Sequence, residues 1–243
     1  MHIRHVPRRK GLIMKSLVVV FSSFKLEKST PEYNLDRQKE YAACYRQLLR
    51  VVPDGLDVLF VDNSIRSADE IDSIELKESL AGCKILLTRQ NFGERNKGVG
   101  ELVMLIQASQ AVNFTEYKKV LYCTGRKFFT CPYPFDKALE TDKPVTVSNP
   151  DFQFLTGEFR EVAKNMFNDM FFAMDSIRMI QFIEFTKPRL QMMEELMINS
   201  ESNLYEFIQQ KKIDFQFLEF LGIIRNEQNT RDPYLAIENF HIC

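Results

Sequence analysis

Leu17-Val-Val-Val-Phe21 is a continuous apolar run rich in β-branched residues, and it decides the fold. Such a run is typical of a strand that is buried on both faces, as strands are in a parallel sheet. Three later runs have the same character, at residues 57–61, 84–88 and 119–123. Apolar residues at helical spacing predict helices over about 36–51 and 99–112. Strands that alternate with helices predict an α/β fold with a mostly parallel, Rossmann-type central sheet flanked by helices.

The second half of the chain has a different character. Strands are predicted at 145–148 and 152–155, as a hairpin around Asn149-Pro150, and a short apolar segment runs from 165 to 174. From about 188 to 208 apolar residues recur at helical spacing, so the C-terminal part is predicted to be helical. In the first half, Pro31 is interpreted as a break in the chain after the first strand. Residues 14–243 are therefore expected to form a single domain, with halves at 14–130 and 131–243.

The first residues concentrate basic side chains: His2, Arg4, His5, Arg8, Arg9 and Lys10. We interpret residues 1–13 as a disordered basic leader, or as an overextended start upstream of Met14. A weak anchor to an acidic membrane surface is an alternative, and it would give peripheral membrane contact. A signal peptide is disfavoured because the apolar run at 16–21 is too short and no small-residue cleavage site follows it.

The composition limits the classes of partner. Lys and Arg total 32 against 33 Asp and Glu, for a formal net charge of -1. This balance creates no global field for nucleic acid, so no nucleic-acid partner is expected. No segment approaches the roughly 20 apolar residues that span a bilayer. The five cysteines are scattered without a C-x-x-C pair, and there are only three His, so no zinc site is predicted. Reduced thiols and a cytoplasmic location are expected.

Polar clusters follow three of the predicted strands. They are Asp62-Asn63-Ser64, the segment Asn91–Gly98 with Arg89 just before it, and Thr124-Gly125-Arg126. Ligands of open α/β sheets bind outside the carboxyl ends of the strands. We therefore expect the three clusters to share one crevice.

Each cluster also has an ordinary structural explanation. Asp62 is suited to accept hydrogen bonds from a uracil, guanine or ribose group, but Asp-Asn-Ser also caps turns. The glycines at 93 and 98 would let a phosphate approach the backbone, or would simply form a strand-to-helix turn. This segment is not a P-loop, because Val99 stands where that motif needs Lys. Arg126 is suited to bind a diphosphate, or is an exposed arginine in a turn.

The order of these clusters, followed by Asn168-Asp-Met-Phe-Phe172, resembles GT-A-fold glycosyltransferases over roughly 16–221. The resemblance is to small bacterial and viral members with Thr-Gly-Arg at the strand end. It implies a UDP-, GDP- or dTDP-linked sugar donor bound by the first half, and a glycan or lipid-linked acceptor over the second. The donor-binding residues that it implies are Asp62, Asn63, Ser64, Arg89, Asn91, Gly93, Lys97, Gly98, Thr124, Gly125 and Arg126.

The chain departs from the family pattern at its metal site, because the Asp-x-Asp motif expected near the fourth strand end is absent. Arg126 is a candidate substitute for the metal ion. No metal ligand and no cofactor is assigned, and a role for Mn²⁺ or Mg²⁺ stays open.

Inverting transfer, the expected course of the reaction, needs a general base, for which Asp169 and Glu201 are candidates and Glu101 a weaker third. Each acid would otherwise be a helix cap or a surface residue. A non-catalytic nucleotide-sugar-binding module and a nucleotidyltransferase are the alternative functions.

Overall fold

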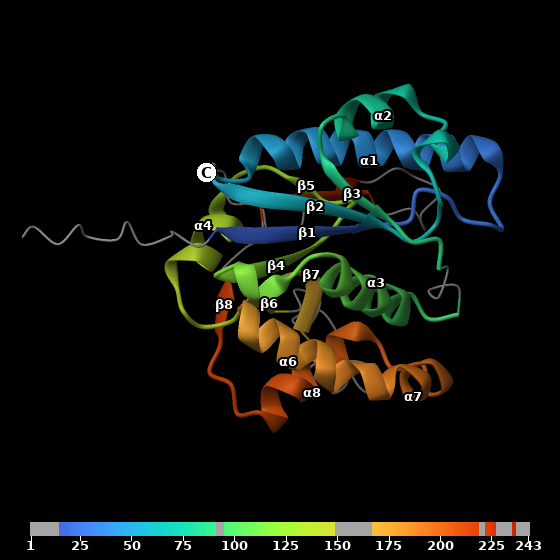
Figure 1. Cartoon of the computed structure of the whole chain (residues 1–243). Coiled ribbons are helices and arrows are strands. Elements are labelled where there is room, and N and C mark those ends of the chain that lie inside the picture. The colour runs from blue at the N-terminus through green and yellow to red at the C-terminus, as the bar shows by residue number, and fades with distance from the viewer. Residues whose placement is uncertain (1–14, 91–94, 149–166, 219–221, 227–234, 237–243) are drawn as a thin grey trace, which may run out of the picture.

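The computed structural model describes residues 15–90, 95–148, 167–218, 222–226 and 235–236. Its centre is a seven-stranded sheet with the order β3-β2-β1-β4-β7-β6-β8 (Figure 1). The strands are β1 (Ser16–Ser22), β2 (Leu56–Asp62), β3 (Lys84–Leu87), β4 (Lys119–Thr124), β6 (Val145–Ser148), β7 (Phe167–Asp175) and β8 (Gln216–Leu218). β3, β2, β1 and β4 are parallel, β7 is antiparallel to β4 and β6, and β8 is parallel to β6. The expected α/β fold with a mostly parallel central sheet flanked by helices is confirmed.

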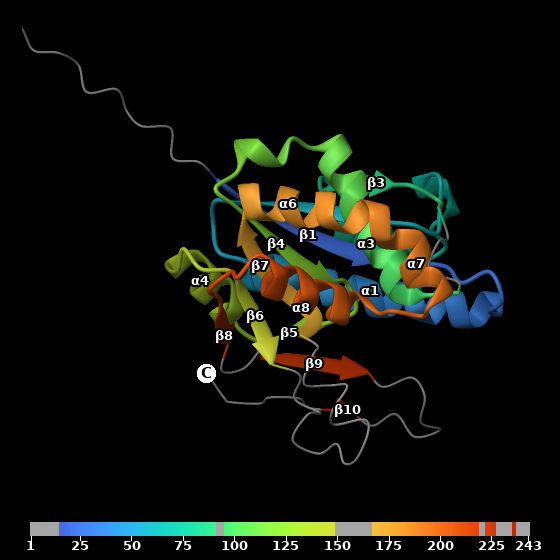
Figure 2. The same cartoon turned by 90° about the horizontal axis from the view of Figure 1, so that it is seen from below.

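Helices cover both faces of this sheet (Figures 1 and 2). One face carries α1 (Pro31–Val51), α2 (Ile74–Leu80) and α4 (Tyr133–Glu140). The other face carries α3 (Lys97–Ala111), α6 (Ser176–Thr186), α7 (Leu190–Glu195) and α8 (Ser200–Gln210). Short 3-10 turns lie at Ala68–Glu70, Phe114–Glu116 and Lys187–Arg189. A small second sheet joins β5 (Phe128–Phe129), β9 (Ile223–Asn226) and β10 (Leu235–Ala236).

The apolar run of β1 is continuous because both of its faces are covered. Val18 and Val20 belong to the core under α1, whereas Leu17, Val19 and Phe21 belong to the core under α3, α6 and α8. All five side chains are at most 3% exposed. β1 therefore joins the two cores and fixes the layered arrangement.

Two helix predictions were wrong in position. Pro31 does not break the chain; it occupies the first turn of α1, where a proline costs no hydrogen bond, and Thr30 Oγ1 caps the helix by accepting from Tyr33 N–H. The single helix predicted over 188–208 is two, because the chain turns at Met197 (φ 54°) before Asn199 caps α8. A further helix, α6, was not predicted and begins where Asp175 caps it.

The predicted strand at 152–155 and the hairpin at 149–150 lie outside the described residues, as do residues 1–14.

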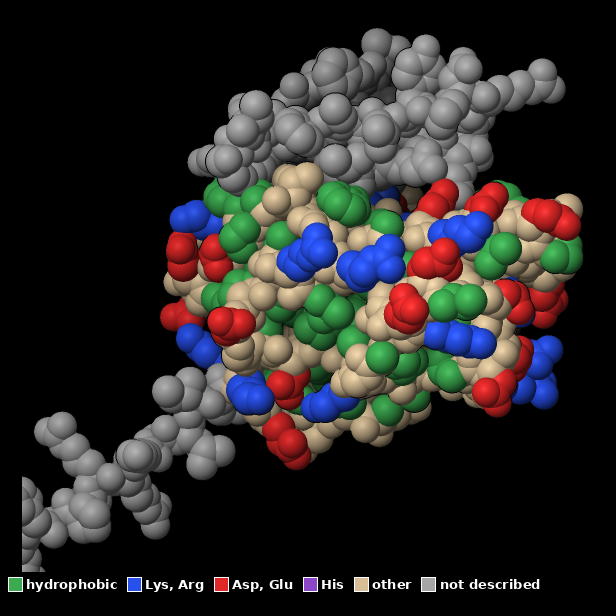
Figure 3. Space-filling model, turned by 90° about the horizontal axis from the view of Figure 1, so that it is seen from above, with side chains coloured by type: hydrophobic (Ala, Val, Ile, Leu, Met, Phe, Trp, Pro, Cys, Tyr) green, Lys and Arg blue, Asp and Glu red, His purple; other side chains and the backbone are tan. Residues whose placement is uncertain are grey.

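The face of the molecule drawn in Figure 3 carries charges of both signs. Figure 3 shows acidic and basic side chains interspersed over the face that carries α1 and α2. Within the described part of the chain, no helix is both long enough and apolar enough to cross a membrane.

Candidate functional site

The sheet order defines a switch point between β1 and β4. From β1 the chain continues to β2, toward the β3 edge of the sheet. From β4 it continues to β6 and β7, toward the β8 edge. Connections that diverge in this way leave a crevice outside the carboxyl ends of the two strands, where α/β proteins bind ligands. The segments after β1, β2 and β4 therefore border the candidate site.

The loop after β1 is held by four successive hydrogen bonds. The backbone N–H groups of residues 23 to 26 donate in turn to Tyr41 Oη (3.0 Å), Asp62 Oδ2 (2.8 Å), Ser64 Oγ (3.0 Å) and Asn34 Oδ1 (2.9 Å). The acceptors come from α1 and from the end of β2, so these two elements fix the shape of the loop. Since these N–H groups already have acceptors, a ligand here would depend on side chains.

Asp62 is the centre of this arrangement. Its side chain is fully buried, and Oδ1 accepts hydrogen bonds from Ser64 N–H (2.7 Å), Ser64 Oγ–H (2.6 Å) and Ile65 N–H (3.1 Å). Burial raises the pKa of the carboxyl to about 6, although the hydrogen bonds oppose this shift. Asn63, 4% exposed, accepts from Ser23 Oγ–H (2.6 Å). Asp62 thus caps its own turn, while Asn63 and Ser64 bond the loop after β1, so all three residues have structural roles without a ligand.

Gly125 closes β4 against β1. Its N–H donates to Phe21 O (2.7 Å), and a Cβ at this position would lie 2.7 Å from the same oxygen and 2.9 Å from the Tyr41 ring. A side chain does not fit there. The preceding Thr124 is 9% exposed, and its Oγ1 is buried without a hydrogen-bond partner among the described residues.

Two arginines lie beside the switch point. Arg126 follows Gly125 and forms an ion pair with Glu40 of α1 (3.3 Å), with 29% of its side chain exposed. Arg37, one turn earlier on α1, is only 8% exposed; it donates to Ser23 O and to Tyr41 Oη (3.3 Å). No carboxylate of the described residues forms an ion pair with Arg37. Its guanidinium carbon lies 5.4 Å from the centre of the Tyr41 ring, and a buried charge without a carboxylate partner among the described residues favours an anionic ligand.

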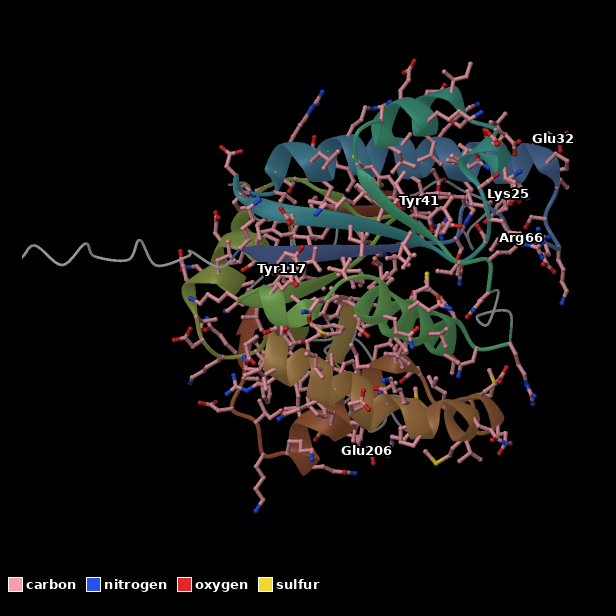
Figure 4. The ribbon with its side chains drawn as sticks, viewed as in Figure 1. Lys25, Glu32, Tyr41, Arg66, Tyr117 and Glu206 are labelled. Atoms are coloured by element: carbon pink, nitrogen blue, oxygen red, sulfur yellow. The ribbon has the colours of Figure 1, made fainter. Side chains whose placement is uncertain are left out.

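Further basic side chains stand beyond β2 and β3. Arg89 follows β3 in a left-handed conformation (φ 38°), which is unusual for a residue other than glycine. The pKa of the Glu70 carboxyl is lowered first by the hydrogen bond from Arg66 N–H, and then by the charges of Arg89 and Lys25. Figure 4 shows Lys25 and Arg66 at the same end of the molecule, away from Tyr117. We did not predict a role for Lys25 or Arg66 from the sequence. Their positions soon after the ends of β1 and β2 could have indicated one.

The N-terminus of α3 is occupied by protein groups. Asn96 Oδ1 accepts from Gly98 N–H (3.0 Å) and Val99 N–H (3.4 Å). A Cβ on Gly98 would lie 2.6 Å from Ser200 N, so this glycine allows α3 and α8 to meet closely. This contact explains why a glycine stands at position 98, and no ligand is needed to explain it.

The candidate acids differ in their surroundings. Glu101 is 7% exposed, accepts from Tyr122 Oη–H (3.0 Å) and forms an ion pair with Lys97 (3.2 Å). Glu201 lies in the first turn of α8, next to the contact between Gly98 and Ser200. Asp169 lies in β7, two residues before Phe171, which pairs with Cys123 of β4, so its backbone reaches the same edge. The side chain of Asp169, and all of Asn91 and Gly93, lie outside the described residues.

The structure thus brings most of the predicted residues to one edge of the sheet, but in different roles. Asp62, Asn63, Ser64, Gly98 and Gly125 shape the backbone, whereas Arg89, Lys97 and Arg126 present charge. In the part of the chain that is described, no group of three or more His, Cys, Asp or Glu side chains could hold a metal ion.

Comparison with known proteins identifies no family for this chain. No family model matches the chain, and no curated protein matches it. Among solved structures, the apo crystal structure of mouse Xyloside xylosyltransferase 1 is similar over 84% of this chain and 84% of that chain. The two sequences are 12% identical and the TM-score is 0.47. A likeness this distant does not bear on function, which has to be inferred from the site.

Proposed function

We propose that the protein transfers a sugar from a nucleoside-diphosphate sugar to an acceptor hydroxyl, with the diphosphate at the switch point between β1 and β4. The observation that carries this proposal is the buried charge of Arg37, which has no ion-pair partner among the described residues and lies on the helix that also holds Arg126. Arg37 and Glu40, the partner of Arg126, are three residues apart on α1 and so adjacent on its surface. This adjacency supports the proposal that both guanidinium groups bind one anion.

This arrangement suits the chemistry of a leaving diphosphate. Negative charge develops on the diphosphate as the bond to the sugar breaks, and it needs a fixed positive partner. Arginine supplies a planar fork that binds phosphate oxygens with two hydrogen bonds. Arg66 and Arg89 would add positive potential at the mouth of the crevice, whereas Lys25 is paired with Asp72 (2.8 Å). Arginine side chains would then do what a metal ion does in related enzymes, while dependence on Mn²⁺ or Mg²⁺ stays a prediction to test.

The acceptor hydroxyl would lose its proton to Asp169 or Glu201 in an inverting transfer. Support for both acids is their position at the carboxyl edge, on β7 and on the first turn of α8. Glu101 is less suited to act as the base, because its carboxylate is already bonded to Tyr122 and Lys97. We place the glycan or lipid-linked acceptor over the second half of the chain.

Thermal-shift measurements with UDP, GDP and dTDP, each with and without Mn²⁺, test the binding of the donor. We expect at least one nucleotide to stabilise the protein. Arg126→Gln and Arg37→Lys should each weaken the binding of that nucleotide about tenfold, because each variant loses a bidentate contact with the phosphate. Arg46→Gln, an exposed arginine farther along α1, is the control and should bind as the wild type does. If none of the nucleotides stabilises the wild type, the proposal is wrong.

A binding module without catalysis is the second candidate, since no metal-holding group of acids is found among the described residues. It would bind the nucleotide but release no nucleoside diphosphate from any donor sugar. Asp169→Asn and Glu201→Gln separate the two: at least one should abolish turnover in a transferase while nucleotide binding is unchanged.

A further inference from the structure

A groove of about 440 Å³ lies between α3 and α7, outside the switch point. Its volume is within the range of small-molecule sites. Four glutamines line it: Gln90 after β3, Gln107 and Gln110 on α3, and Gln191 on α7.

One of these amides has an unmet hydrogen bond. Gln107 Nε2 donates to Gln90 Oε1, but Gln107 Oε1 is buried and accepts no hydrogen bond from any described residue. A buried polar atom without a partner is costly, and a rotation of the partly exposed Gln107 amide toward the groove would let a ligand donate to it and remove that cost. The groove therefore favours a ligand that carries hydrogen-bond donors.

The remaining lining indicates what kind of ligand fits. The wall is aliphatic, formed by Val99, Val103, Ile106 and Leu190. Glu194 is the single charged residue of the lining, and it is an acid. A phosphorylated or uronic-acid ligand would meet a negative charge with no cation opposite it. Amides that both donate and accept, beside an aliphatic wall, match the hydroxyls and C–H faces of an uncharged sugar.

The groove also points toward the candidate site. Gln90 and Val99 lie at the carboxyl edge of the sheet, and Gln110 lies near the far end of α3. Val99 and Gln110 are eleven positions apart on α3, a distance of about 16 Å along the helix. An extended chain in the groove would therefore have one end beside the switch point.

We propose that this groove binds a neutral oligosaccharide, the acceptor chain of the transfer, so that the acceptor would extend from the second half of the chain at α7 onto α3 of the first half. The inference rests on the proposed function, because only a transferase needs an acceptor that leads to the diphosphate. Gln107 would accept from a sugar hydroxyl, and the exposed Gln110 and Gln191 would bind hydroxyls farther along the chain.

Methyl NMR of the full chain tests this directly, with maltohexaose, xylohexaose and chitohexaose as neutral probes. Hexagalacturonate and an uncharged hexapeptide serve as an anionic and a peptide probe. We expect at least one neutral hexasaccharide to shift the methyl signals of Val103, Ile106 and Leu190. Gln107→Met keeps the length of the side chain without its amide and should weaken binding about tenfold. Val103→Phe should abolish binding by filling the groove.

Gln181→Met, an exposed glutamine on α6 outside the groove, is the matched control and should change nothing. Binding of the hexapeptide or of hexagalacturonate in preference to every neutral sugar would overturn the inference, as would the absence of any shift. UDP, GDP and dTDP titrations of the same samples distinguish the two proposals. If a nucleotide binds and no sugar does, the groove inference fails alone; if no nucleotide binds, the proposed function fails as well.

Discussion

At the scale of single residues, the polar cluster after β2 and the glycine after β4 act on the backbone around them. Asp62 accepts from the loop after β1 and from its own turn, while Gly125 lets β4 close against Phe21. Both residues stand where the sequence predicts ligand contacts. The sequence cannot separate these roles, because the same residue types bind phosphate or ribose and form tight turns.

Gly125→Ala should lower the free energy of unfolding by about 3 kcal/mol, because the new Cβ must displace a backbone oxygen and the Tyr41 ring. Gly55→Ala is the control: its surroundings are empty, and its cost of about 1 kcal/mol comes only from a φ of 88°. Urea unfolding of the two variants measures the difference. Equal costs would show that the contact around Gly125 is looser than described.

The pH dependence of stability should report on Asp62. The folded carboxyl has a pKa of about 6, above the ordinary value of 3.8 expected in the unfolded chain. Between about pH 4 and pH 6 the folded state therefore binds the proton that the unfolded state has lost. The contribution of Asp62 to stability falls as the pH rises through this window, by roughly 3 kcal/mol in total. Urea unfolding at pH 4.5, 5.5 and 6.5 should show a smaller fall for Asp62→Asn; parallel curves would contradict this.

At the scale of elements, Asn96 joins three helices. Its Oδ1 caps α3, and its Nδ2 donates to Met193 O (3.1 Å) and Ile198 O (2.9 Å), which hold the connection between α7 and α8. One buried side chain therefore sets the distance at which α8, with Glu201, approaches the carboxyl edge.

Asn96→Asp should preserve the cap but place a carboxylate against two carbonyl oxygens, at a cost of about 2–3 kcal/mol. Asn199→Asp is the matched exchange, because Asn199 also caps a helix by accepting from Ser202 N–H. It should change stability by no more than about 0.5 kcal/mol. Thermal unfolding of both variants measures this, and a neutral Asn96→Asp would refute the bridging role.

The strands could be predicted from the sequence more closely than the helices. The apolar runs of β1 to β4 are continuous because both faces of the sheet are covered, and this pattern marks their bounds to within a residue or two. The bounds of α1, α6 and α8 depend on Thr30, Asp175 and Asn199, whose side chains accept from specific N–H groups. A cap of this kind is decided by local geometry, which spacing alone does not reveal.

At the scale of the whole molecule, the packing of helices on the sheet buries two cysteines, Cys44 of α1 and Cys123 of β4. Cys123 of β4 is fully buried, and burial raises the pKa of its thiol well above the ordinary value. Burial, followed by the charge of Glu40, raises the pKa of the Cys44 thiol to about 12. Cys83, near β3, is partly exposed.

Iodoacetamide at pH 8 should therefore modify Cys83 in the folded protein, but Cys44 and Cys123 only when the sheet opens. Peptide mass spectrometry after timed labelling measures the three rates, with labelling in concentrated urea as the reference. Modification of Cys123 as fast as Cys83 would mean that the sheet opens locally at β4.

The location of the candidate site follows from the sequence, while most of its charge does not. Alternation of strands and helices brings the polar clusters to one edge, so the convergence after β2, β3 and β4 could be predicted. Arg37 could not, because on the sequence it is one polar residue of an amphipathic helix. Its significance depends on burial and on the absence of a carboxylate among the described residues, and both depend on tertiary packing.

The loop after β1, held at residues 23 to 26 by four side chains, has a consequence for the rate of ligand binding. Its conformational entropy is lost when the chain folds, so none remains to be lost when a nucleotide arrives. Association should then be set by diffusion and electrostatic attraction, with no slow rearrangement of this loop. Salt should slow the association of nucleotide, and the loop itself should present the same shape before and after the encounter.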